Sequence, residues 1–77
     1  MKDEETDKLT AAVVGRLQQR REELGLSVNK LAELAGMTHV GILKLESGDR
    51  TPMLRTALKL SKALDLRLSS VLAELGL

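Results

Sequence analysis

The stretch Leu26–Gly48 constrains the fold most, because its pattern fits two short helices separated by a tight turn. A serine cap followed by apolar residues at helical spacing predicts a helix over residues 28–35. Gly36 supplies the positive φ that ends a helix at low cost, and Thr38 is a good cap for a second helix over about residues 39–46. The sequence therefore predicts two short helices that meet at a sharp angle.

The second of these helices has different inward and outward faces. Ile42 and Leu45 are three residues apart and point inward. The outward side chains are those of His39, Val40, Leu43 and Lys44. Two helices joined by a short turn containing glycine form a helix-turn-helix, whose second helix can enter the major groove of DNA.

Three further helices are predicted around this pair. A long first helix follows Thr6, which is its expected cap, and ends at Gly25. A fourth helix covers residues 53–64 and a fifth covers residues 68–75, each with an apolar stripe. Met53 stands where a capping side chain is usual, so the start of the fourth helix is less well fixed.

We expect an all-α fold with one compact domain of five helices. The sequence has no period-two run of β-branched residues and no Asn-Gly hairpin. Residues 1–5 are charged and lack periodicity, so they are expected to be a disordered N-terminal segment, and residues 6–77 to form the domain.

Composition excludes several classes of function. The 77 residues contain no cysteine and no aromatic residue, so disulfides, thiolate zinc sites and base stacking on aromatic rings are ruled out. His39 is the only histidine, and the carboxylates fall at typical surface positions, so we expect no enzyme activity, metal site or cofactor. Without a leader pattern or a long apolar run, a cytoplasmic protein with no membrane segment is expected.

The net charge of +1 understates the basic character of the predicted domain. Of the 12 basic and 11 acidic side chains, residues 1–8 hold two and four, which leaves ten basic and seven acidic groups in the rest of the chain. This excess is small for a nucleic-acid binder. It favours modest affinity per monomer with help from a second subunit.

The order of these residues resembles the Cro and phage-repressor type of helix-turn-helix family, also called the xenobiotic-response-element family of bacterial transcriptional regulators. The residues concerned are Leu31-Ala32, Ala35-Gly36-Met37, Ile42, Leu45-Glu46, Gly48 and Pro52. The resemblance covers roughly residues 11–75. It implies a lambda-repressor-like fold that binds double-stranded DNA, and it pairs Arg21 of the first helix with Glu46 at the end of the recognition helix.

The candidate DNA-binding residues divide by role. We expect phosphate contacts from Ser27, Lys30, Thr38, Arg50, Thr51 and Arg55. The predicted base-reading residues are His39, Val40, Leu43, Lys44 and Val28. His39 and Lys44 can donate to guanine N7 or O6, Val40 can meet a thymine methyl group, and Gly41 is expected to let the backbone approach the DNA.

Three of these positions depart from the family pattern. Val28, Val40 and Leu43 are aliphatic where relatives often have polar residues, and Asp49 puts a negative charge near the expected phosphates. An exposed aliphatic patch is also typical of a protein-binding surface. The alternative function is therefore a protein-interaction module, such as an antitoxin-like or regulator subunit, that binds a partner protein.

The favoured hypothesis is a small dimeric transcriptional regulator, because one short helix makes too few base contacts for useful specificity. The fifth helix has more apolar residues than docking needs. If Leu68 and Leu72 pack against the domain, then Val71, Leu75 and Leu77 remain as an apolar ridge. We expect this ridge to form the homodimer interface across a two-fold axis.

Overall fold

The computed structural model describes residues 3–77 and has five helices there. They are α1 (Glu4–Glu23), α2 (Val28–Ala35), α3 (His39–Ser47), α4 (Leu54–Ala63) and α5 (Leu68–Glu74). Within these residues there is no strand, and the five-helix, all-α architecture predicted from the sequence is confirmed.

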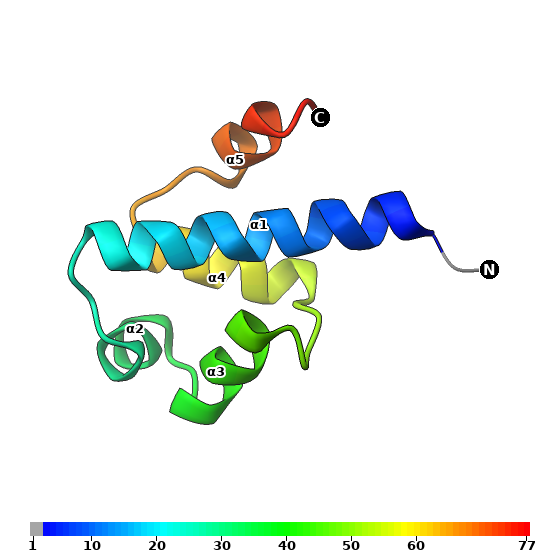
Figure 1. Ribbon diagram of the computed structural model, residues 1–77. Coiled ribbons are helices and arrows are strands. Elements are labelled where there is room, and N and C mark those ends of the chain that lie inside the picture. The colour runs from blue at the N-terminus through cyan, green and yellow to red at the C-terminus, as the bar shows by residue number, and fades with distance from the viewer. Residues whose placement is uncertain (1–2) are drawn as a thin grey trace.

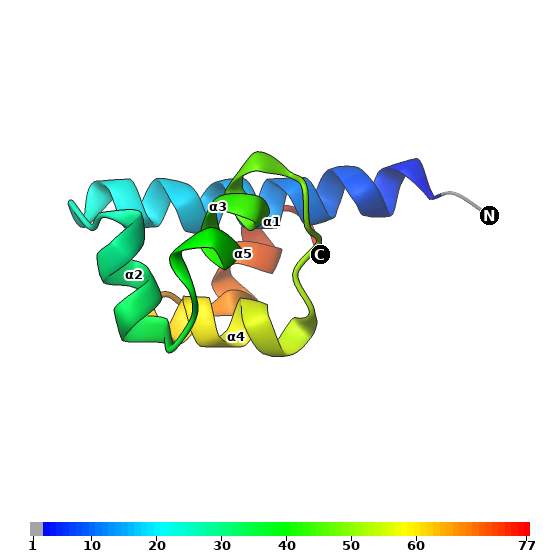
Figure 2. The same ribbon diagram turned by 90° about the horizontal axis from the view of Figure 1, so that it is seen from below.

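The long helix α1 divides the molecule (Figure 1). It packs against α3, α4 and α5, whereas α2 packs against α3 and α4. Helices α2 and α3 lie on one side of α1, and α5 lies on the other (Figure 1). In the view from below, α2 and α3 face the reader and α5 lies behind them (Figure 2). The predicted two-helix unit therefore occupies one face of the domain.

Helix α1 begins earlier than the sequence indicated. Its cap is Asp3, whose carboxylate accepts hydrogen bonds from the Thr6 amide at 3.1 Å and the Thr6 hydroxyl at 2.6 Å. Thr6 is therefore inside the helix rather than its cap, and Glu4 and Glu5 are helical instead of disordered. The physical reason is that Asp3 caps well and the acidic first turn is favoured by the helix dipole. Residues 1 and 2 of the expected disordered segment lie outside the described residues.

The hydrophobic core joins α2 and α3 to α1 and α4. Its buried members are Leu17, Leu31, Ala32, Ala35, Ile42, Leu45, Leu60 and Leu64. Leu17 comes from α1, and Leu64 follows the last residue of α4. Because both inward residues of α3, Ile42 and Leu45, are at most 3% exposed, the orientation of this helix is set by the core.

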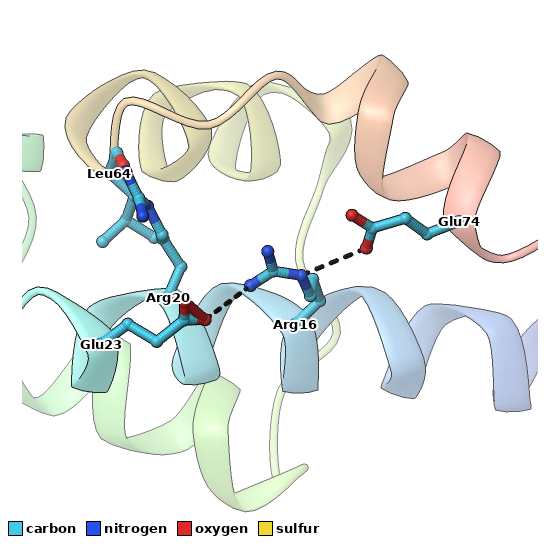
Figure 3. Close-up of polar contacts among 5 residues, drawn as sticks. All are labelled: Arg16, Arg20, Glu23, Leu64 and Glu74. Atoms are coloured by element: carbon cyan, nitrogen blue, oxygen red, sulfur yellow. Dashed lines mark hydrogen bonds and ion pairs between the residues drawn. The ribbon is translucent and has the colours of Figure 1, made fainter.

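Arg16 and Arg20 of α1 make polar contacts with α5 and with the end of α4 (Figure 3). Arg20 donates from Nε to the main-chain oxygen of Leu64 at 3.1 Å, which satisfies a carbonyl at the end of α4. Arg16 donates from Nε to Glu74 of α5 at 3.2 Å and from Nη1 to Glu23 at 3.3 Å. These contacts fix both α4 and α5 against α1.

The predicted role of α5 needs one correction. Val71 is fully buried, Leu75 is half-buried and Leu77 is 67% exposed. This short helix packs against both α1 and α4, and Val71 is its buried residue, so the Val71 side chain is used in contacts within the domain. Val71 therefore cannot belong to a dimer interface.

Candidate nucleic-acid interface

Hydroxyl caps and one left-handed glycine set the geometry of α2 and α3. Ser27 accepts a hydrogen bond from the Lys30 amide at 3.0 Å, and Thr38 accepts one from the Gly41 amide at 3.0 Å. Between the helices, Gly36 adopts a φ of 65°, which a side chain would disfavour. The predicted caps and turn of the helix-turn-helix are therefore present in the structure.

The outer face of α3 is exposed as the sequence indicated. His39, Val40, Leu43 and Lys44 all point to solvent, while Ile42 is buried. Val40 is 56% exposed and Leu43 is 44% exposed. This face therefore offers an imidazole, an ammonium group and two aliphatic side chains to whatever binds it.

Val28 does not belong to this exposed face. It is half-buried and packs against the core. Val28 is the first residue of α2, and it continues the inward stripe of Leu31, Ala32 and Ala35 by one turn. Part of the Val28 side chain is therefore used in packing, and its base-reading role stays a prediction.

Gly41 also has a different role from the one expected. It is buried, and a Cβ atom built there would lie 2.9 Å from the Thr38 hydroxyl oxygen. The absent side chain thus leaves room for the cap of α3 rather than for DNA. The same Cβ position is 3.8 Å from Nη1 of Arg50, which places that guanidinium beside the start of α3.

The predicted phosphate-binding residues surround the helix-turn-helix. Ser27, Lys30, Thr38, Arg50, Thr51 and Arg55 are all exposed. The Arg50 amide donates to the carbonyl of Lys44 at 3.1 Å, so the loop after α3 is fixed to the end of that helix. Lys30 pairs with Glu33 at 3.8 Å, but both side chains are more than half exposed, so this ion pair is weak and easily exchanged for a phosphate.

Arg21 and Glu46, which the resemblance pairs, are in contact. Arg21 donates to the two carboxylate oxygens of Glu46 at 2.8 and 3.0 Å and to the carbonyl of Leu26 at 2.8 Å. The hydrogen bond to Glu46 raises the pKa of Arg21 above its ordinary value, against the opposing effect of burial. This forked contact fixes the end of α3 to α1 and to the start of α2.

One side-chain contact on this surface could not be predicted from the sequence. The Nδ1 atom of His39 is hydrogen-bonded to the amide oxygen of Asn29. These residues are ten positions apart and come from α3 and α2, so helical periodicity could not pair them. They come together because the turn at Gly36 brings the start of α3 alongside α2.

Residues 3–77 have neither a metal-binding cluster nor a helix that could span a membrane. They contain no group of three or more histidine, cysteine, aspartate or glutamate residues placed to hold a metal ion. No helix in the same part of the chain has the length and apolar character to span a membrane.

An all-α domain in which two capped helices meet at a glycine turn, with the second helix exposed on one side, defines a helix-turn-helix protein. A family model described as helix-turn-helix matches residues 17–71. The chain belongs to this family, which confirms the resemblance seen in the sequence. The match begins in the middle of α1, so the first three turns of that helix lie outside it.

Curated proteins with similar sequences have names in the same class. Over 59 residues the chain is 39% identical to the HTH-type transcriptional regulator PuuR of Escherichia coli (strain K12), a match that covers 77% of this chain and 32% of PuuR. The putative regulatory protein MJ1164 of Methanocaldococcus jannaschii is 42% identical over 52 residues, which is 68% of this chain and 16% of that protein.

A shorter relative is matched over most of its length. The uncharacterized HTH-type transcriptional regulator YgzD of Bacillus subtilis (strain 168) is 34% identical over 56 residues, or 73% of this chain and 85% of YgzD. In PuuR, by contrast, the matched segment spans about a third of the protein. The similarity to the longer relatives is therefore confined to a segment of helix-turn-helix size.

Proposed function

We propose that this chain is a sequence-specific, double-stranded DNA-binding domain that acts as a dimeric transcriptional regulator with α3 in the major groove. The observation that supports this most strongly is the division of α3 into two faces. Its inner residues are fixed in the core, and its outer residues are free for base edges. The proposal includes a cytoplasmic location, where such a regulator reaches its DNA, and assigns no enzyme activity.

The exposed groups suit different tasks at the DNA surface. Lys44 can donate to guanine N7 or O6, and Val40 and Leu43 can meet thymine methyl groups. Arg50 and Arg55 lie on the loop after α3 and the first turn of α4, where they can contact phosphates on either side of the groove. The amides at the starts of α2 and α3 add donors for the backbone.

We propose a homodimer because a single α3 offers only five exposed side chains, those of His39, Val40, Leu43, Lys44 and Ser47. Two copies on a palindromic site double these contacts and place the recognition helices about one DNA turn, or 34 Å, apart. Val71 is buried within the domain, so Leu75 and the exposed Leu77 are the two residues of the predicted apolar ridge that remain. We propose these two residues as part of the dimer contact.

Selection of bound sequences from random duplex DNA tests the proposal directly. An enriched inverted repeat, with half-sites one helical turn apart, is the expected result. An unrepeated half-site would contradict the dimer. The failure to enrich any sequence, at a salt concentration where the protein still binds duplex DNA, would contradict sequence-specific binding.

Substitutions at two cations separate base reading from phosphate binding. Lys44→Ala should weaken the best site by about 1–3 kcal/mol and relax the preference at one base position. Arg50→Ala should weaken all sequences alike, because a phosphate contact has no sequence information. Competition binding to the selected site and to scrambled DNA distinguishes the two effects. A uniform loss in both variants would contradict the base-reading role of Lys44.

A second candidate function is an interaction module for a partner protein. It is favoured by the exposed aliphatic side chains of α3 and by three more at the start and along one side of α4: Met53, Leu54 and Leu58. Such side chains gain more from an apolar partner than from DNA. Binding that is independent of salt and needs Leu54 or Leu58 but not Lys44 would favour this function.

A further inference from the structure

The contact between Asn29 and His39 determines the chemical character of the base-facing imidazole. Asn29 is the second residue of α2 and His39 is the first residue of α3, and both are exposed on the helix-turn-helix surface. The amide oxygen of Asn29 faces Nδ1 of His39. Because an amide oxygen accepts hydrogen bonds and does not donate them, this orientation of the Asn29 amide favours a proton on Nδ1.

A neutral imidazole has a single N–H group, so a proton on Nδ1 leaves Nε2 with an unshared electron pair. We propose that Asn29 holds His39 in the Nδ1–H tautomer, and that Nε2 accepts a hydrogen bond from an exocyclic amino group in the major groove. This inference rests on the proposed function, because it needs the start of α3 to lie against base edges. Asn29 is then a positioning residue and His39 is the residue that meets the base.

The major groove offers such amino groups on two bases, adenine at N6 and cytosine at N4. Guanine presents the acceptors N7 and O6, and thymine presents the acceptor O4 and a methyl group. An accepting Nε2 atom therefore fits adenine or cytosine and has no hydrogen bond to make with guanine or thymine. This replaces the expectation from the sequence that His39 donates to guanine, while Lys44, which can only donate, keeps that role.

The first test needs no DNA. His39 is the only histidine, so nitrogen-15 spectra of the imidazole are unambiguous. In the neutral form, the wild type and Asn29→Asp should have the proton on Nδ1, because both side chains offer an accepting oxygen there. Asn29→Ala should lose this preference. A neutral wild-type ring with its proton on Nε2, or no change in Asn29→Ala, would overturn the proposal.

The second test identifies the base that His39 contacts. It is carried out at a pH where the nitrogen-15 spectra show a neutral His39 ring. The position at which His39→Ala changes the selected sequence is the one read by His39, and adenine or cytosine should be preferred there. Replacing adenine by purine, or cytosine by pyrimidin-2-one, removes the amino group and also one hydrogen bond of the base pair, so the loss is compared with that of His39→Ala. The wild type should lose about tenfold more affinity than His39→Ala, the effect of one lost hydrogen bond to the protein. The analogue that has this effect identifies which base supplies the group.

The same preference should be retained in Asn29→Asp, even if its added charge weakens binding to all sequences, and it should be relaxed in Asn29→Ala. Guanine or thymine at the position, or a selected sequence that His39→Ala leaves unchanged, would overturn the inference although DNA binding itself stands. If no sequence is enriched at all, the proposed function fails and the base preference fails with it. The nitrogen-15 spectra still report whether Asn29 sets the tautomer, so the two failures are distinguishable.

Discussion

Asp3 caps the start of α1 with a carboxylate whose ionised form is favoured by hydrogen bonds from Thr6. Hydrogen bonds from the side chain and the amide of Thr6 lower the pKa of Asp3 below its ordinary value of 3.8. Since the folded pKa is the lower one, the cap stabilises the first turn fully above the unfolded value and loses this effect as the pH falls through the folded value. We expect the first turn of α1 to fray in this acidic range, and the amide chemical shift of Thr6 to report it.

Asp3→Asn provides the matched control for this titration. Asparagine caps helices about as well as aspartate but does not ionise, so the Thr6 amide should no longer follow the pH in this range. Unchanged acid fraying in Asp3→Asn would attribute the effect to the other carboxylates of the first turn.

Arg21 and Glu46 form the second residue-scale feature that can be tested. Their side chains are 12% and 13% exposed, and Arg21 makes two bonds to the carboxylate and one to a carbonyl. Removing one partner leaves the other poorly solvated, so Arg21→Ala and Glu46→Ala should each cost about 3 kcal/mol. The double variant should lose less than the sum of the two, because the shared contact is lost once.

Urea unfolding followed by circular dichroism measures these losses. Arg21→Lys is the control, because a lysine keeps the charge but cannot form the forked pair, and it should remain clearly destabilised. Small losses that simply add would mean that the two groups act as independent surface charges.

At the scale of elements, Val71 in the middle of α5 and Leu77 beyond the end of that helix should respond in opposite ways to an introduced charge. Val71 is fully buried whereas Leu77 is 67% exposed. Val71→Asp buries a carboxylate among aliphatic groups and should unfold the domain, while Leu77→Asp should leave the helical content and the melting temperature nearly unchanged. A folded Val71→Asp variant, observed by thermal melting, would contradict the packing of α5 against α1 and α4.

The elements also differ in how far the sequence predicted them. The region α2–α3 was predicted closely, because the caps Ser27 and Thr38 and the turn at Gly36 are local signals. The prediction that Val71 lies in a dimer interface was wrong because α1 and α4 together determine which side of the apolar stripe of α5 is covered. The partial burial of Val28 was missed for a similar reason, since the core extends to the first turn of α2. The contact of His39 with Asn29 depends on the angle between two helices, which the sequence pattern does not give.

At the scale of the whole molecule, the proposed DNA binding should be electrostatic in origin. Three to five phosphate contacts per subunit give a dimer a slope of about −5 to −9 in a plot of log affinity against log salt concentration. The domain measures 35 × 24 × 19 Å, so two copies side by side can place their α3 helices near the 34 Å repeat of DNA. Fluorescence anisotropy with labelled duplex DNA at several salt concentrations gives the slope. A slope near half this range, with a monomer in sedimentation, would contradict the dimer, and an affinity independent of salt would contradict phosphate binding.

The close fit of Gly41 against Thr38 also affects how such a domain can evolve. Alanine at position 41 would crowd the Thr38 hydroxyl, which caps α3, whereas glycine at position 38 would remain an acceptable cap residue. A lineage that changes position 38 first therefore keeps an acceptable cap, whereas one that changes position 41 first must displace the Thr38 hydroxyl. Position 41 lies between the outward-facing Val40 and Leu43, so the order of substitutions at positions 38 and 41 affects how well the start of the recognition helix is capped along the way.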